Sequence, residues 1–282
     1  MGEVVYGSVL SQRLKDELKE KIEADIQSGL KRPKLGVILV GEDPASLSYV
    51  KGKEKAATYV GIDSEVHRLP EETTQEELNK LIRELNDDPK VDGILLQLPL
   101  SKQLDSREAL ELIDPSKDVD GLGIINSGKL FLKEEGFYPC TPLGVIELLK
   151  EMKVEIEGKH AVVVGRSNLV GLPVSRLLLN ENATVTTCHS RTSNLKEITR
   201  QADILVVAIG KAEFITGDYI KEGAYVIDVG VNRVDGKLKG DVKFDEAVDK
   251  VAAITPVPKG VGPMTITMLM YNTYKARGDK HD

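Results

Sequence analysis

The chain has 282 residues, 41% of them hydrophobic and 29% charged, so it is long enough for two domains that each bury a core. Its formal net charge of -7, with acidic and basic residues interleaved, argues against nucleic acid or an anionic membrane as the main partner. The start lacks the pattern of a secretory signal, and no window approaches the roughly 18 apolar residues of a membrane span, which predicts a cytoplasmic protein.

The numbers and positions of cysteine and histidine limit the disulfide and metal sites that the chain can form. The only two cysteines, Cys140 and Cys188, allow no disulfide framework and are expected to be small buried residues in a reducing compartment. The four histidines lie too far apart in sequence to form a local metal motif, so we expect no metal cofactor.

Short runs rich in Val and Ile alternate with helical patterns along the whole chain, which predicts the α/β fold class with a parallel sheet covered on both faces. Apolar residues every four positions from Leu10 to Ile26 predict an opening helix that ends near Gly29. A strand is expected to follow at residues 34–41.

The next helix has clear start and stop signals. Asp43 is a suitable N-cap, Pro44 suits the first helical position, and Gly61 is a typical C-terminal stop. Further strands are expected at residues 64–69 and 91–100, separated by a helix that Thr74 and Glu77 open as a capping box.

The second half begins after residues 128–140, in which no period of 3.6 or 2 persists, so this stretch is expected to be irregular. Thr141 and Pro142 are expected to start a helix that runs through Met152. Five strands with Rossmann-like spacing follow, at residues 160–165, 183–189, 202–210, 224–231 and 251–258, and a final helical pattern begins after Pro263.

A glycine-containing turn follows the first of these strands and leads into a helix. Gly165 and Gly171 let the chain turn sharply and approach a ligand, while the N-terminus of the helix offers N–H groups and a positive dipole end to phosphate. The turn therefore predicts a diphosphate site. Because its spacing is not the usual G-x-G-x-x-G, an ordinary turn between strand and helix is the alternative.

The end of the second Rossmann strand indicates which dinucleotide would bind. NAD-binding units usually carry an acidic residue there to hold the ribose 2′-OH, whereas this strand ends in His189, Ser190 and Arg191. A hydroxyl and a guanidinium suit a 2′-phosphate, and Arg166 can add a second guanidinium, which predicts NADP. A solvated loop arginine is the alternative interpretation of Arg191.

Polar residues in the first half form a second candidate site. Tyr49 and Lys53 lie one turn apart on one helix face, while Lys51 and Lys55 project elsewhere. Periodicity alone does not distinguish Lys53 from its two neighbours. Gln97 stands at the carboxyl end of an apolar strand, where ligand sites gather in parallel sheets.

The segment from Asp118 to Leu122 also draws attention, because its spaced aspartates suggest a calcium loop. Lys129 occupies the twelfth position, where such a loop requires glutamate, and this interpretation is rejected.

Seven collinear segments resemble the bifunctional methylenetetrahydrofolate dehydrogenase/methenyltetrahydrofolate cyclohydrolase family, and together they span nearly the whole chain. They are residues 43–57 (DPASLSYVKGKEKAA), 97–100 (QLPL), 117–122 (KDVDGL), 140–144 (CTPLG), 164–173 (VGRSNLVGLP), 184–190 (TVTTCHS) and 255–265 (TPVPKGVGPMT).

The resemblance implies two domains across a cleft. Residues 1–138 with a C-terminal helix at 264–282 would form the folate-binding catalytic domain, and 139–263 would form a Rossmann-type NADP-binding domain with a parallel sheet. It also implies a homodimer through the Rossmann halves. The implied activity is oxidation of 5,10-methylenetetrahydrofolate with NADP, followed by hydrolysis of the product to 10-formyltetrahydrofolate.

The resemblance also implies roles for single residues. Lys53 would be the catalytic lysine, Tyr49 would stack against the folate, Gln97 would contact Lys53 and the ligand, and Asp120 would anchor the pterin. The predicted NADP-binding residues are Thr141, Gly165, Arg166, Ser167, Ser190, Arg191 and Val231, and the further substrate-binding residues are Pro258, Gly262 and Pro263.

One position departs from the family pattern. The family usually has Gly-Gly where this chain has Lys259 and Gly260, so a cation replaces a backbone that is free to adopt positive φ. Two rival functions remain at this point. One is an NADP dehydrogenase with a single activity and another small substrate, and the other is a nucleotide-binding regulatory protein without catalysis.

Overall fold

The computed structural model describes residues 2–278. In chain order the elements are β1 (Glu3–Val4), α1 (Gly7–Gln27), β2 (Lys34–Val40), α2 (Pro44–Val60), β3 (Asp63–Leu69), α3 (Gln75–Asp87), β4 (Gly93–Leu96), α4 (Ser106–Leu112), α5 (Ile124–Leu132), α6 (Cys140–Glu151), β5 (His160–Val164), α7 (Gly171–Asn180), β6 (Thr184–Cys188), α8 (Leu195–Thr199), β7 (Ile204–Val207), the 3-10 helix η1 (Gly217–Tyr219), β8 (Tyr225–Asp228), β9 (Asn232–Val234), β10 (Lys237–Lys239), α9 (Phe244–Ala247), β11 (Ala253–Ile254) and α10 (Val261–Ala276).

These elements belong to two compact units. The six-stranded unit consists of the chain up to Gln12 together with Thr141–Thr265, and the three-stranded unit consists of Arg13–Cys140 together with the chain from Ile266 on. The sequence-based division had placed the first residues of the chain in the other domain. They lie in the six-stranded unit because β1 pairs in parallel with β11. The last four residues of the predicted domain, 279–282, lie outside the described residues.

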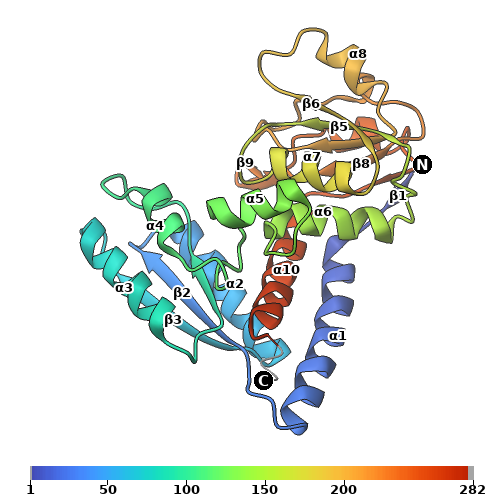
Figure 1. The fold of residues 1–282 in the computed structure, drawn as a ribbon. Coiled ribbons are helices and arrows are strands. Elements are labelled where there is room, and N and C mark those ends of the chain that lie inside the picture. Colours follow the sequence, from blue (N-terminus) through green and yellow to red (C-terminus); the bar gives the residue numbers. More distant parts are fainter. Residues whose placement is uncertain (1, 279–282) are drawn as a thin grey trace. The chain divides into compact units, whose positions relative to one another are not determined.

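The three-stranded unit is built on a parallel sheet of order β3-β2-β4. Along β2, Ile38 and Val40 pack in one apolar cluster with Leu78 and Ile82 of α3, and α4 contributes to the same cluster. Because side chains alternate along a strand, the intervening residues of β2 face the other side of the sheet. Figure 1 shows α2 on that side and α3 and α4 on the first, so both faces of the sheet are covered as predicted.

Local capping explains where the helices of this unit begin and end. The Asp43 side chain accepts a hydrogen bond from the Ser46 N–H at 2.8 Å, and Gly61 ends α2 in the left-handed conformation with φ +88°. Thr74 and Glu77 form the reciprocal capping box that opens α3. All three signals were predicted from the sequence and are confirmed.

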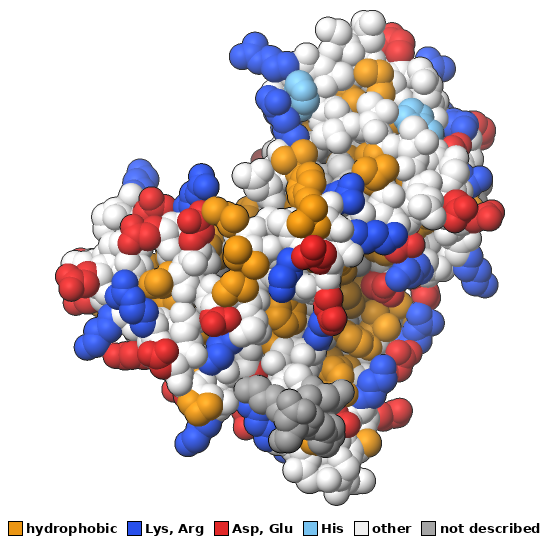
Figure 2. Space-filling view, viewed as in Figure 1, with side chains coloured by type: hydrophobic (Ala, Val, Ile, Leu, Met, Phe, Trp, Pro, Cys, Tyr) orange, Lys and Arg blue, Asp and Glu red, His pale blue; other side chains and the backbone are white. Residues whose placement is uncertain are grey.

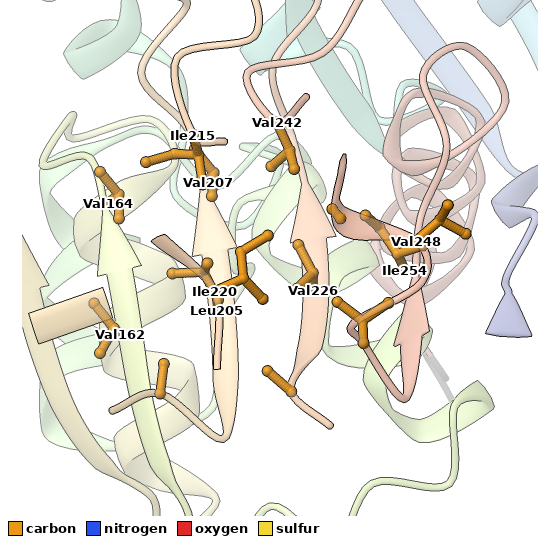
Figure 3. Close-up of a cluster of buried hydrophobic side chains, with 14 of the residues drawn as sticks. Val162, Val164, Leu205, Val207, Ile215, Ile220, Val226, Val242, Val248 and Ile254 are labelled. Atoms are coloured by element: carbon orange, nitrogen blue, oxygen red, sulfur yellow. The ribbon is translucent and has the colours of Figure 1, made fainter. Parts of the chain in front are cut away.

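The six-stranded unit contains a parallel sheet of order β1-β11-β8-β7-β5-β6. Its strands are short and rich in β-branched residues. The buried apolar cluster of Figure 3 includes one residue from each of three adjacent strands, namely Val162, Leu205 and Val226. The chain runs from β5 to β6 on one side and then to β7 on the other, so the strand order reverses between β5 and β7. Ligands of doubly wound sheets bind at such a reversal. The α/β fold class with a Rossmann-type parallel sheet is confirmed.

Some elements differ from the sequence-based expectation. Residues 128–140 were expected to be irregular, but α5 covers the first of them. The strand expected at 251–258 is reduced to β11, which is two residues long. The antiparallel hairpin of β9 and β10 was missed, although Asp235 and Gly236 between them, both at positive φ, form the Asp-Gly turn typical of hairpins.

The surface matches the interleaved charges of the sequence. Figure 2 shows basic and acidic side chains interspersed over the visible face rather than gathered by sign. Among residues 2–278, no helix combines the length and the apolar character needed to cross a membrane.

Candidate active site

Lys53 is distinguished from its neighbours by its contacts. Its ammonium nitrogen Nζ donates a hydrogen bond to Gln97 Oε1 at 2.8 Å, whereas Lys51 and Lys55 are exposed. Gln97 is buried just past the end of β4, and its amide nitrogen donates to the Leu98 carbonyl at 2.6 Å, which turns its oxygen towards Lys53. The lysine is therefore held in one position by a fixed neutral acceptor. Tyr49, one turn earlier on α2, is 55% exposed and offers an open ring face.

Asp120 lies in a loop whose two preceding polar residues anchor it. The Lys117 ammonium donates to three carbonyls at the end of α3, those of Leu85, Asn86 and Asp88, at 2.7 to 3.1 Å. The buried Asp118 carboxylate accepts hydrogen bonds from the Leu122 and Gly123 N–H groups and from the Asn126 amide. Sequence reasoning did not identify these anchors, although both stand in the KDVDGL motif that it singled out.

A residue of the last helix secures the same loop from the other side. Asn272 of α10 is buried, and its amide donates to the Val119 carbonyl at 2.8 Å and to the Tyr138 carbonyl at 3.1 Å. The Cys140 thiol also points to the Val119 carbonyl, at 3.5 Å. These contacts fix the backbone on both flanks of Asp120. No local sequence signal indicated Asn272, because its partners are more than a hundred residues away.

The charges in this cluster act on one another. Burial lowers the pKa of Lys53, and the negative charge of Asp120 opposes that shift. Burial also raises the pKa of the Cys140 thiol well above its ordinary value, and the nearby Asp120 carboxylate adds to the effect. Cys140 is therefore a neutral thiol at pH 7, and the proton of Lys53 is held less tightly than that of a solvated lysine. The expectation that Cys140 and Cys188 are buried is confirmed.

In the six-stranded unit, the turn after β5 has no room for side chains at its two glycines. A Cβ on Gly165, which has φ +134°, would lie 2.3 Å from the Ala208 carbonyl oxygen, and one on Gly171 would lie 2.2 Å from the Gly165 oxygen. The Ser167 hydroxyl accepts hydrogen bonds from the Val170 and Gly171 N–H groups at 3.2 and 3.4 Å. The result is a tight backbone cradle that opens onto the start of α7, the arrangement that dinucleotide sites use for a diphosphate.

The turn after β6 presents its two predicted cofactor residues to solvent. The His189 N–H donates to the Thr192 hydroxyl at 2.8 Å, and His189 Nδ1 accepts the Arg191 N–H at 3.1 Å, so the backbone is fixed. The side chains of Ser190 and Arg191 are exposed. A fixed backbone with a free hydroxyl and guanidinium is suited to hold a phosphate.

The remaining predicted residues also lie in the six-stranded unit. The Thr141 and Thr265 hydroxyls are hydrogen-bonded to each other at 2.8 Å, which ties α6 to α10, and Val231 after β8 is 51% exposed. Pro258 follows β11, and Gly262 and Pro263 belong to the first turn of α10. In the three-stranded unit, Lys53, Gln97 and Asp120 come together. In residues 2–278 no group of three His, Cys, Asp or Glu side chains is placed to hold a metal ion.

Lys259 adopts the conformation for which glycine is suited, with φ +78°. Its carbonyl accepts the Ser8 N–H at 3.0 Å, which ties this strained turn to the start of α1. A side chain in the left-handed region costs about 1 to 2 kcal/mol.

We therefore expect Lys259→Gly to stabilise the chain by about 0.5 to 1 kcal/mol, after allowing for the extra flexibility of glycine in the unfolded state. Thermal unfolding measures the change. Lys259→Ala keeps the positive φ and serves as the control, and an equal rise in its midpoint would contradict the explanation.

Comparison with known proteins supports this two-part arrangement. The family model described as the tetrahydrofolate dehydrogenase/cyclohydrolase catalytic domain matches residues 5–120, and the model described as the NAD(P)-binding domain of the same family matches residues 139–281. The bifunctional protein FolD of Oceanobacillus iheyensis is 55% identical, with 100% of this chain and 99% of that protein covered.

Solved structures agree. The bifunctional enzyme FolD of Campylobacter jejuni is 50% identical and superposes with a TM-score of 0.96, covering 98% of this chain and 99% of its own. The Trypanosoma brucei enzyme, solved in complex with NADP cofactor and inhibitor, is 40% identical with a TM-score of 0.93 and covers 98% of this chain and 97% of its own. This chain belongs to the tetrahydrofolate dehydrogenase/cyclohydrolase family.

Proposed function

We propose that this chain oxidises 5,10-methylenetetrahydrofolate to 5,10-methenyltetrahydrofolate with NADP and hydrolyses that product to 10-formyltetrahydrofolate. The family assignment supports both reactions. The observation that carries the second reaction is the hydrogen bond from Lys53 to the buried Gln97, with Asp120 alongside, because it supplies a positioned proton carrier.

The six-stranded unit fits NADP. The Gly165 and Gly171 cradle would hold the diphosphate, and Ser190 and Arg191 would hold the 2′-phosphate, with Arg166, Ser167, Thr141 and Val231 as further cofactor residues. When bound, NADP supplies an acceptor for the hydride of the methylene bridge. The folate nitrogens stabilise the resulting cation, so the protein needs no acid or base in this step and contributes by positioning.

Hydrolysis needs a proton carrier. Water adds to the bridge carbon of the methenyl cation and must lose a proton, and one folate nitrogen must gain a proton when the ring opens. Neutral Lys53 takes the first proton, and the resulting ammonium gives it to the folate nitrogen that leaves. The hydroxyl proton of the adduct passes to solvent as the formyl C=O forms, so hydrolysis releases one proton overall and none remains on the enzyme. Burial favours the neutral amine, and the Gln97 oxygen, which can only accept, keeps one N–H of the amine turned away from the water.

Tyr49 and Asp120 would hold the folate, with Pro258, Gly262 and Pro263 as further substrate residues.

This role predicts how hydrolysis depends on pH. The neutral fraction of Lys53 increases with pH, and because its pKa is lowered, the rate should rise and level off at a pH below 10.5, its ordinary value. Asp120→Asn removes the charge that opposes the shift, so this basic limb should move to lower pH. A profile of kcat against pH at saturating substrate measures it, and a move to higher pH in Asp120→Asn would contradict the assignment.

The function is tested by incubating the purified chain with 5,10-methylenetetrahydrofolate and NADP. NADPH fluorescence reports oxidation, and separation of the folates reports 10-formyltetrahydrofolate. NADPH without the formyl product would indicate a dehydrogenase with a single activity. Binding of NADP with neither product would indicate a nucleotide-binding regulatory protein.

We also propose that two copies associate through their six-stranded units and that the chain works in the cytoplasm. The dimer is what the resemblance to the family implies. Two free, buried cysteines are consistent with a reducing compartment. Light scattering on the purified chain distinguishes a dimer from a monomer.

A further inference from the structure

Two carboxylates are buried at the ligand end of the six-stranded sheet, and neither takes part in the proposed chemistry. Asp241 is fully buried, and its carboxylate accepts three consecutive backbone N–H groups of the loop after β7. The donors are Ile209 at 2.7 Å, Gly210 at 2.9 Å and Lys211 at 2.7 Å. Successive N–H groups that converge in this way form a nest for an anion, and here the anion is the protein's own side chain.

Asp228, the last residue of β8, holds the second set of contacts. It is 3% exposed, and its carboxylate accepts the N–H groups of Gly230, Asp241 and Val242 at 2.9 to 3.0 Å. It thereby fixes the segment that carries Asp241 and the start of the loop that leads to Val231. In Figure 3, Val242 lies beyond the carboxyl end of β8, the strand that carries Val226.

The backbone packs closely against the carboxylates of Asp228 and Asp241. A Cβ on Gly230 would lie 2.1 Å from the Asp241 carboxyl carbon, and one on Gly240 would lie 1.8 Å from Asp228 Oδ2. Asn232 of β9 adds a side-chain donor to Asp241 at 2.9 Å. Each carboxylate is therefore surrounded by hydrogen-bond donors and by the backbone of a glycine. Any other residue at Gly230 or Gly240 would place its Cβ against the carboxylate.

Stability alone does not account for this arrangement. Burial raises the pKa of Asp228 to about 7, and the neighbouring Asp241 charge adds to the shift, so the folded chain carries a cost for keeping Asp228 ionised. Buried charges are commonly no more stabilising than apolar side chains of similar volume. What the pair does achieve is to fix the positions of two loops.

Those loops lie where the strand order reverses. The loop after β7 stands beside the glycine turn after β5, since Ala208 is the residue that a Cβ on Gly165 would strike. One wall of the proposed dinucleotide site is thus the glycine turn. The other is the segment 208–211, whose shape is set by Asp241.

We propose that Asp241 is a positioning residue of the NADP site, which holds the loop 208–211 in the form that the cofactor contacts, and that Asp228 holds Asp241 and the approach to Val231 in place. This inference rests on the proposed function, because it requires that the six-stranded unit binds NADP. It adds two residues to that site which do not themselves touch the cofactor.

The test is Asp241→Asn, which keeps the size of the side chain but places an amide N–H against backbone N–H groups. The dissociation constant for NADP, measured by isothermal titration calorimetry, should rise at least about tenfold, because the loop 208–211 loses two hydrogen bonds to a charged acceptor and must be ordered when NADP binds. Hydrolysis of methenyltetrahydrofolate supplied without NADP should stay within about twofold of the unmodified rate. A purely structural role would lower both together.

A milder variant covers the case in which Asp241→Asn does not fold. Asn232→Ala removes one of the four donors to Asp241 and should weaken NADP binding about threefold with hydrolysis unchanged. Lys237→Ala on the same hairpin is exposed and serves as the matched control.

Unaltered NADP binding in a folded variant, or equal loss of both activities, would overturn the inference. Absence of NADP binding by the unmodified chain would instead overturn the proposed function.

Discussion

Replacing Lys53 with methionine should lower the rate of methenyltetrahydrofolate hydrolysis by about a hundredfold to ten-thousandfold, the usual contribution of a general acid or base. Methionine keeps the length and apolar stem of the side chain but cannot carry the proton. Oxidation of 5,10-methylenetetrahydrofolate should fall much less, because that step depends on alignment. Methenyltetrahydrofolate should therefore accumulate, and separate assays of the two steps on the purified variant measure the difference.

Two further variants isolate the cause. Lys53→Arg keeps the positive charge and the ability to donate to Gln97, but arginine does not lose its proton near pH 7, so hydrolysis should fall as far as in Lys53→Met. Lys51→Met changes an exposed lysine on the same helix and should leave both rates unchanged. If Lys53→Arg retained full hydrolysis, positive charge rather than proton transfer would be the function of Lys53.

Removal of the Arg191 side chain should raise the KM for NADP at least about tenfold and leave the KM for NAD nearly unchanged. A charge-assisted hydrogen bond to phosphate contributes about 1.5 to 3 kcal/mol, and each 1.4 kcal/mol corresponds to a factor of ten. Arg191 is exposed, and its backbone is already fixed by His189, so Arg191→Ala should change the ligand contact and not the turn. Initial rates with each dinucleotide measure the effect.

Arg200→Ala is the matched control, because Arg200 is another exposed arginine of the same unit, at the end of α8. Its preference for NADP should equal that of the unmodified chain. Equal use of NADP and NAD by the unmodified chain would contradict the proposed 2′-phosphate contact.

Local signals predicted local structure well. Asp43, Gly61 and the Thr74–Glu77 pair act within one turn of the chain, so the bounds of their helices could be predicted from neighbouring residues alone. The strand expected at 91–100 covers only Gly93–Leu96, and the next residue, Gln97, is hydrogen-bonded to Lys53 of α2. That hydrogen bond joins residues 44 positions apart in the sequence, so no local pattern contains it.

The same distinction applies to the candidate site. The sequence pattern does not distinguish Lys53 from Lys51 and Lys55. Only the burial of Lys53 and its hydrogen bond to Gln97 do so. The family resemblance had nevertheless indicated that position. Asp228 and Asp241 were not predicted at all, because a buried aspartate surrounded by backbone N–H groups has the same local sequence as an exposed one.

The pairing of β1 with β11 affects the order in which the two sheets can form during synthesis. The polypeptide passes between the two units at Gln12, Cys140 and Thr265, and Glu3 pairs with Ala253. During synthesis on the ribosome, the first strand has no partner until the last strand has emerged, and closing so long a loop carries a large entropic cost. The six-stranded sheet is therefore completed only when almost the whole polypeptide has been translated, whereas β2, β3 and β4 lie close together in sequence and can pair early.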